Sequence, residues 1–141
     1  MSLAHHNLVA WQRADNLFIE VHQLTHQRFP RFERFELGSQ LRRAAYSVPA
    51  NIVEGIARGV GRDSIRFLKI ARGSLSELGY GLHACMRLGY IDAEQLALLN
   101  QKLQAIGGPL QGLIKKRRVE IGVKVGGSGL IAFFAFGATL F

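Results

Sequence analysis

The chain has 141 residues, a length typical of a single domain. Lysine and arginine number 18 against 10 acidic residues, a formal net charge of +8, and 48% of the residues are hydrophobic, enough for a buried core. The single cysteine excludes a disulfide framework and a multi-cysteine zinc site. The first ten residues lack the basic and apolar regions of a signal peptide, so we expect a cytoplasmic protein.

The positive charge is concentrated in two segments. Residues 28–72 carry ten basic against four acidic residues, a net charge of +6, and residues 115–141 carry five against one, a net charge of +4. A basic surface attracts the phosphates of nucleic acids and raises the rate of association with them. Two other interpretations stay open, namely attraction to anionic lipid headgroups and a solvated face that keeps the protein in solution.

The first two helical segments are predicted from hydrophobic periodicity. Between about residues 8 and 28, apolar residues recur at steps of three and four, and Phe29-Pro30 should end the helix. Between about residues 36 and 57 a wider apolar stripe continues in register on both sides of Pro49, so we expect a kink there rather than a stop. The stripe consists of Leu37, Leu41, Ala44, Ala45, Val48, Ile52 and Ile56.

Two more helical segments follow. Asp63 or Ser64 should cap the third helix, which reaches about Leu88 and contains Gly73, Gly79 and Gly81, small residues that can allow a close helix contact. Asp92 should begin the fourth, with Gln95 as its capping-box partner. Gly107-Gly108-Pro109 predicts a kink or a broken last turn in the fourth helix. Short connections between four amphipathic helices predict an all-α fold, an antiparallel up-down four-helix bundle, over residues 1–118.

Residues 119–141 form an apolar C-terminal tail. The twelve residues from Leu130 to Phe141 are almost wholly apolar, but a helix across a bilayer needs about 20. A longer span would include Glu120 and Lys124, which are costly in a membrane. A membrane partner is therefore disfavoured, and we expect the tail to be disordered or to pack on a partner subunit.

No residue pattern predicts catalysis, a metal or a cofactor. His22 and His26 have the i, i+4 spacing of two metal ligands, but no acidic third ligand is near in sequence, so exposed histidines are the simpler interpretation. Cys85 lies on an apolar stripe and is predicted to be a buried, unreactive thiol. Glu54 and Glu77 can act as acid and base in principle, but ion pairing is simpler. We expect a protein that is not an enzyme.

Basic side chains provide the strongest functional signal. Arg62, Arg66 and Lys69 form one row on the third helix at i, i+4 and i+7. Arginine suits phosphate because its planar fork donates two hydrogen bonds together, and A-form RNA is recognised through its backbone and shape. We therefore expect phosphate contacts to RNA, or to DNA, with little base readout. The predicted contact residues are Arg42, Arg43, Arg58, Arg62, Arg66, Lys69, Lys115, Lys116, Arg117 and Arg118.

A polar stripe lies beside the apolar face of the second helix. Its members are Gln40, Arg43, Ser47, Asn51 and Glu54. Polar side chains next to a core face can pair across subunits, or they can cap groups within the chain around Pro49. The subunit interface is the preferred hypothesis, and intrachain pairing is the alternative.

Several motifs are similar to those of a known family. They are Val9-Ala10-Trp11-Gln12, the segment GSQLRRAAYSVPANIVEG at 38–55, Arg66-Phe67-Leu68, Gly73-Ser74-Leu75, Glu77-Leu78 and Gly112-Leu113-Ile114-Lys115. The chain thus resembles the bacterial four-helix-bundle family encoded within intervening sequences of 23S ribosomal RNA genes, which is related to the accessory variability determinant of diversity-generating retroelements. This resemblance implies a four-helix bundle and assembly into a homopentameric ring.

Two functions agree with these expectations. For the retroelement accessory proteins, the resemblance implies binding to nucleic acid and to a reverse transcriptase. The first hypothesis is therefore a non-enzymatic oligomer that binds structured RNA through its basic helix faces. The second is a homo-oligomeric scaffold that binds a protein partner and has no nucleic-acid role. A steep dependence of RNA affinity on salt favours the first, and salt-insensitive capture of a protein favours the second.

Overall fold

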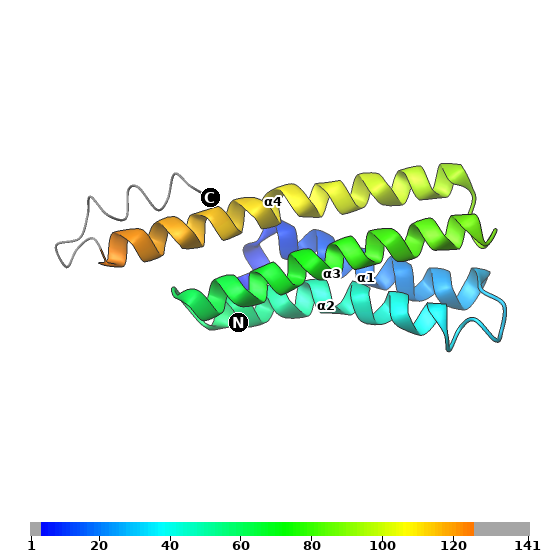
Figure 1. The fold of residues 1–141 in the computed structure, drawn as a ribbon, viewed down its shortest axis with the longest axis horizontal. Coiled ribbons are helices and arrows are strands. Elements are labelled where there is room, and N and C mark those ends of the chain that lie inside the picture. Colours follow the sequence, from blue (N-terminus) through cyan, green and yellow to red (C-terminus); the bar gives the residue numbers. More distant parts are fainter. Residues whose placement is uncertain (1–3, 126–141) are drawn as a thin grey trace.

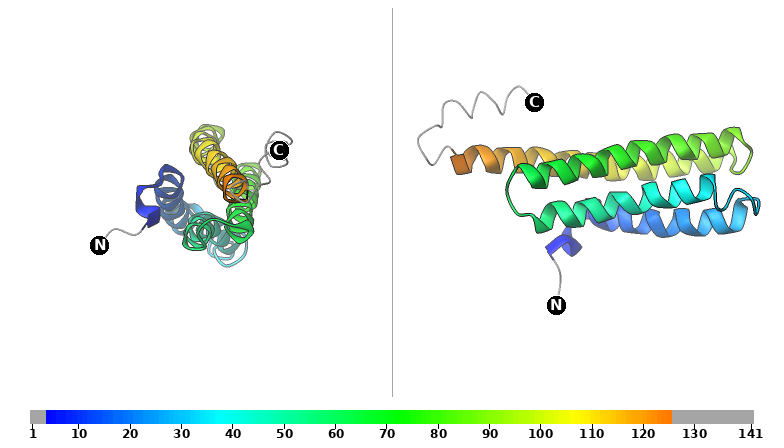
Figure 2. Two further views of the ribbon diagram at one scale, coloured as in Figure 1. Left: turned by 90° about the vertical axis from the view of Figure 1, so that its left-hand side faces the viewer. Right: turned by 60° about the horizontal axis from the view of Figure 1, so that its bottom comes forward.

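The computed structural model describes residues 4–125, which form a short 3-10 helix and four α-helices (Figure 1). Helix η1 spans Ala4–Asn7, α1 Val9–Arg28, α2 Leu37–Ala57, α3 Arg62–Arg87 and α4 Ala93–Val125. Consecutive helices run in opposite directions and pack on each other, and α1 also packs on α4. The α1–α2 pair and the α3–α4 pair form two layers (Figure 2). The predicted antiparallel up-down four-helix bundle is confirmed for the described residues.

The apolar stripes of the helices meet in one core. Each stripe repeats at steps of three and four residues, so that its side chains point to the bundle axis. Burial of each large aliphatic side chain contributes about 1.5–3 kcal/mol. The largest completely buried side chains are Val21 in α1, Leu41, Val48 and Ile52 in α2, Leu68, Leu78 and Leu82 in α3, and Ile106, Leu110 and Ile114 in α4.

Two glycines allow α2 and α3 to approach closely. A Cβ atom added at Gly81 would overlap the Leu41 side chain, and one added at Gly55 would lie 3.0 Å from Leu68. Ser64 Oγ donates a buried hydrogen bond to the Gly55 carbonyl at 2.6 Å. The expectation of a close helix contact is therefore correct at Gly81, whereas Gly73 has no atom within 4 Å of an added Cβ.

The helix ends differ in how well they follow the sequence. The predicted capping box is confirmed, because the Gln95 N–H donates to Asp92 Oδ1 at 2.7 Å and the Asp92 N–H donates to Gln95 Oε1 at 3.0 Å. The expected cap of α3 by Asp63 or Ser64 is wrong. Helix α3 begins at Arg62 after Gly61, without a side-chain capping hydrogen bond, because Ser64 donates to α2 instead.

Helices α2 and α4 both continue through a proline. Pro49 lies inside α2, as its continuous hydrophobic pattern predicts. The broken last turn expected at Gly107-Gly108-Pro109 is wrong, because α4 is one helix of 33 residues. The predicted boundary at residue 118 falls inside α4, which ends at Val125, and the rest of the predicted tail, 126–141, lies outside the described residues. Among the helices between residues 4 and 125, none combines the length and apolarity required to cross a bilayer.

Candidate nucleic-acid interface

The packing of α3 against α4 brings two predicted basic clusters to the same end of the bundle. Arg72 Nη1 donates to Gln111 Oε1 at 2.7 Å, which sets the register between the two helices. Because the helices are antiparallel, residues 66–69 of α3 lie level with residues 114–117 of α4. The N-terminal turns of α3 therefore lie beside the C-terminal half of α4 (Figure 1).

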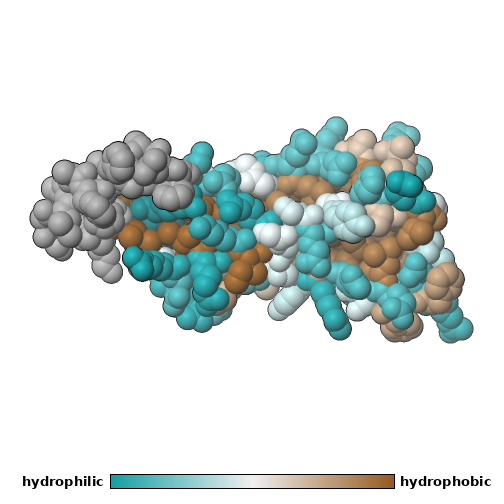
Figure 3. Space-filling view, viewed as in Figure 1, coloured by the Kyte–Doolittle hydropathy of each residue, from teal (hydrophilic) through white to brown (hydrophobic). Residues whose placement is uncertain are grey.

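Exposed cations project from both helices at this end. Arg62 and Lys69 are exposed on α3, where the helical spacing places both on one side of the helix, about 100–120° around its axis from the buried residue Leu68. Lys115 and Lys116 are exposed on α4. None of these four side chains has an ion-pair partner within residues 4–125. We call these four residues the basic end. Hydrophilic side chains cover much of this part of the face seen in Figure 3.

Two predicted contact residues are compensated by carboxylates at the corner between α2 and α3. Arg58 Nη2 lies 2.9 Å from Glu54 Oε1, and Arg58 Nη1 lies 3.7 Å from Asp63 Oδ2. Asp63 Oδ1 in turn lies 4.0 Å from Arg66 Nε. Both guanidinium groups also lie over the Phe67 ring, with Cζ 4.9 Å and 4.5 Å from its centroid. Two cations and two carboxylates cancel locally, so Arg58 and Arg66 add less to the surface potential than the sequence indicates.

Arg42 and Arg117 have structural contacts within the chain. Arg42 is half-buried and donates from Nη1 to Thr25 Oγ1 at 2.9 Å and from Nη2 to the Arg34 carbonyl at 2.7 Å. Arg117, whose side chain is 14% exposed, pairs with Glu120 at 2.8 Å. These guanidinium donors are directed inward, which leaves less of each group for phosphate. Arg118 is half-buried.

Arg43 is exposed on α2, away from the basic end. Ser47 and Ser74 face each other, with their hydroxyl oxygens 2.7 Å apart, and this contact sets the register between α2 and α3. Arg43, one turn before Ser47, therefore lies level with about residue 78 of α3. At 1.5 Å per residue, that level is roughly 14 Å along the bundle from Lys69.

The polar stripe of α2 is partly used inside the subunit. Asn51 Nδ2 donates to the Ser47 carbonyl at 2.8 Å and to Ser47 Oγ at 2.9 Å, and Glu54 pairs with Arg58. The intrachain alternative therefore accounts for Ser47, Asn51 and Glu54. Gln40 and Arg43 are exposed, and their side chains have no hydrogen-bond or ion-pair partner in the described part of the chain.

Cys85, His22 and His26 are the residues considered above as a possible nucleophile and possible metal ligands. Cys85 is completely buried, and burial, with a smaller effect from the charge of Glu33, raises the pKa of its thiol to about 12. The centroids of the His22 and His26 rings are 4.8 Å apart. The pKa of His26 is lowered, mainly by desolvation and to a smaller extent by the charge of His22. Among residues 4–125, no group of three His, Cys, Asp or Glu side chains is arranged to hold a metal ion.

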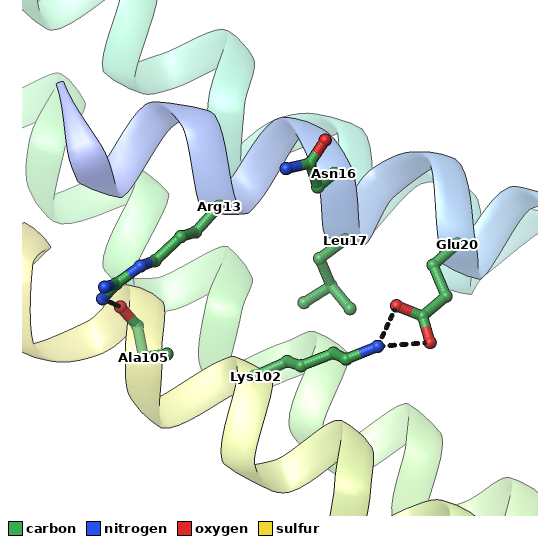
Figure 4. A pocket seen from close by; sticks show the side chains of 6 residues that line it. All are labelled: Arg13, Asn16, Leu17, Glu20, Lys102 and Ala105. Carbon is green, nitrogen blue, oxygen red and sulfur yellow. Dashed lines mark hydrogen bonds and ion pairs between the residues drawn. The ribbon is translucent and has the colours of Figure 1, made fainter. Parts of the chain in front are cut away.

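A pocket of about 240 Å³ lies between α1 and α4 (Figure 4). Lys102 Nζ crosses it to Glu20, with distances of 2.6 Å and 2.8 Å to the two carboxylate oxygens. Arg13 Nη1 donates across the pocket to the Ala105 carbonyl at 2.6 Å. The charged groups at both ends of this pocket have partners, and their contacts hold α1 against α4. None of these groups is therefore available for a reaction.

A second groove, between α1 and α2, was missed by the sequence reasoning. It has a volume of about 450 Å³ and is lined by Trp11, Asp15, Phe18, Tyr46, Pro49, Ala50, Val53 and Glu54. Its residues come from two helices, and only the register between the helices brings them together. The i, i+4, i+7 spacing of Trp11, Asp15 and Phe18 was the available signal, because it places a carboxylate between two aromatic residues.

The model of one protein family matches most of this chain. The family model described as "23S rRNA-intervening sequence protein" matches residues 6–112. The chain belongs to this family. The match ends before Lys115, so half of the basic end lies beyond the part that the 23S rRNA-intervening sequence family model covers.

A solved structure shares this fold. It is from Bacteroides thetaiotaomicron VPI-5482 and is described as a protein with unknown function from the S23 ribosomal protein family. The two chains are 26% identical, with a TM-score of 0.70, and the match covers 76% of this chain and 99% of that chain. No match was found among the curated proteins. The relationship to retroelement accessory proteins stays a prediction.

Proposed function

We propose that this member of the 23S rRNA-intervening sequence protein family is a non-enzymatic protein that binds structured RNA by phosphate contacts at the basic end. The observation that supports it is the position of Arg62, Lys69, Lys115 and Lys116. These four exposed cations come from two helices, lie at the same end of the bundle and have no carboxylate partner within residues 4–125. Unpaired cations on one surface attract a phosphate polymer regardless of its sequence.

The recognition we expect is of backbone and shape. Bundle helices present a convex surface, and the exposed groups of the basic end are point charges and one guanidinium, which suit phosphate oxygens. Base-specific readout of RNA normally uses splayed bases stacked on aromatic side chains. The aromatic side chain between Arg62 and Lys69 is Phe67, and the guanidinium groups of Arg58 and Arg66 already lie over its ring. Binding should therefore vary little with RNA sequence and strongly with salt.

The test is a binding titration of a structured RNA hairpin over a series of salt concentrations. The double variant Arg62→Gln/Lys69→Gln removes two contacts, so the slope of log K against log salt should become shallower by roughly 1.4–1.8. The matched control is Arg28→Gln/Arg87→Gln, which removes the same charge from exposed residues at the opposite end of the bundle. Equal slopes for the two double variants would contradict the proposal.

A scaffold that binds protein is the second candidate, and exposed aromatic side chains favour it. Phe32 and Phe35, in the connection between α1 and α2, are 71% and 79% exposed. Aromatic residues are enriched at protein–protein interfaces relative to the rest of the protein surface. The resemblance to the family leads us to propose a homopentamer as the form of that scaffold. Light scattering checks it, because a pentamer has five times the 15.6 kDa mass of the chain.

A further inference from the structure

The groove between α1 and α2 differs in chemistry from the basic end. Three aromatic residues line it, Trp11 and Phe18 from α1 and Tyr46 from α2. Two carboxylates, Asp15 and Glu54, also line it, and no lysine or arginine does among the described residues. On a chain whose formal net charge is +8, this is a place where aromatic faces and negative charge occur together.

The register of the two helices places Asp15 near the middle of the groove. The Phe18 and Tyr46 rings meet edge to face, with their centroids 5.6 Å apart. Because α1 and α2 are antiparallel, Trp11 lies level with about residue 53 at the other end. Seven residues separate Trp11 from Phe18, which corresponds to a length of about 10 Å at 1.5 Å per residue. Asp15 lies between these two aromatic residues.

The carboxylate of Asp15 has no partner among the residues that the structure describes. Asp15 is half-buried, and its side chain makes no hydrogen bond or ion pair within residues 4–125. Glu54, in contrast, is engaged by Arg58 through Oε1 at 2.9 Å. A partly desolvated carboxylate beside aromatic faces attracts a cation, because the ring quadrupoles and the negative charge act in the same direction.

We propose that this groove binds the arginine or lysine side chain of a partner polypeptide. The charged head pairs with Asp15 and contacts the aromatic residues at the ends of the groove. The methylene stem lies on the apolar floor formed by Pro49, Ala50 and Val53. A guanidinium is favoured over an ammonium, because it is planar, more weakly hydrated and able to stack on a ring while it donates to a carboxylate.

The surroundings of the groove favour a polypeptide over a free cation. Tyr46 on its rim is 60% exposed, and Ile19, one turn after Asp15, is 49% exposed. A small free cation would leave this apolar surface in water, whereas residues flanking an arginine in a polypeptide can cover it. The groove shares no residue with the basic end, so this inference does not depend on RNA binding.

The test uses the intrinsic fluorescence of Trp11, the single tryptophan of the chain. The probe is an acetylated, amidated pentapeptide with one arginine between leucines, titrated into the full chain. Its matched control replaces arginine by citrulline, which is similar in shape and neutral. The arginine peptide should give a saturable change, and the citrulline peptide should bind at least about threefold more weakly.

Variants locate the response. Asp15→Asn removes an unpaired carboxylate and should weaken binding of the arginine peptide roughly threefold to tenfold. Tyr46→Leu removes an exposed ring and should also weaken it. The control is Glu94→Gln, which makes the same charge change at an exposed residue in the first turn of α4.

Four results would overturn the proposal. Equal affinities for the arginine and citrulline peptides would mean that the groove does not select charge. An unchanged affinity after Asp15→Asn would place the peptide elsewhere. Binding of free agmatine as tight as that of the peptide would show that a small cation is the ligand. A fall in the mass of the assembly on Asp15→Asn would show that a second copy of the chain occupies the groove.

Discussion

Arg13 and Ala105 are joined by a hydrogen bond of 2.6 Å, from Nη1 of the arginine to the backbone carbonyl of the alanine (Figure 4). In an uninterrupted α-helix this carbonyl accepts the N–H of residue 109, but residue 109 of α4 is proline and has no N–H. A side chain of α1 thus supplies the donor that α4 lacks, and the same contact ties the first helix to the last.

This relationship predicts that Arg13 and Pro109 are energetically coupled. Arg13→Ala should lower the free energy of unfolding by about 1–2 kcal/mol, because the Ala105 carbonyl loses its partner. In the Pro109→Ala background the restored backbone N–H can satisfy that carbonyl, so the same substitution should cost less, with a coupling energy of about 1 kcal/mol. Urea unfolding of the four proteins measures it. Equal losses in both backgrounds would rule out the coupling.

The close contact of α2 and α3 predicts opposite effects for two glycines of α3. Gly81→Ala should destabilise the protein by about 1–3 kcal/mol, because the new methyl group would overlap Leu41. Gly73→Ala should stabilise it by about 0.5–1 kcal/mol, since the site is exposed and alanine favours the helix. Midpoints of thermal or urea unfolding test both. A stable Gly81→Ala protein would mean that α2 and α3 are further apart.

Burial of Cys85 predicts a thiol that does not react in the native protein. Burial raises the pKa of the thiol to about 12, so almost no thiolate exists at pH 8, and the side chain has no exposed surface. Modification by a disulfide reagent should be slow at pH 8 and should accelerate in urea in parallel with the loss of helical circular dichroism. Rapid modification of fully folded protein would contradict this burial.

The hydrogen bond between Tyr90 and Glu33 predicts a dependence of stability on high pH. Tyr90 Oη donates to Glu33 Oε2 at 2.7 Å, and this bond, with desolvation and the charge of Glu33, raises the pKa of Tyr90 to about 12. The pKa of an unfolded tyrosine is about 10, so the folded state favours the protonated phenol. The stabilisation is therefore fully present below pH 10 and is lost as the pH rises from 10 to 12.

Tyr90→Phe checks this dependence. The variant should be less stable than the original protein, by a difference that is constant between pH 7 and pH 9 and declines above pH 10. A difference that persists unchanged at pH 12 would contradict the raised pKa of Tyr90, because the stabilisation would then not depend on protonation of the phenol.

The candidate site could be predicted from the sequence only in part. The row of Arg62, Arg66 and Lys69 follows from helical spacing, which depends on the local backbone alone. The ion pair between Arg66 and Asp63 is also local. How far this pair lowers the positive surface potential depends on the positions of Phe67 and Arg58. The inward use of Arg42 was not visible in the sequence, because Thr25 lies 17 residues away on another helix.

The sequence by itself determined the helices, the buried face of each helix and the order in which they pack. These depend on the period of the apolar residues and on short connections, both of which are local properties. Tertiary structure decided the continuity of α4 at Pro109, the intrachain use of Ser47 and Asn51, and the assembly of the aromatic groove around Asp15. The reason is physical: a free backbone carbonyl, a hydroxyl or a carboxylate has no defined partner until the register between helices places one within reach.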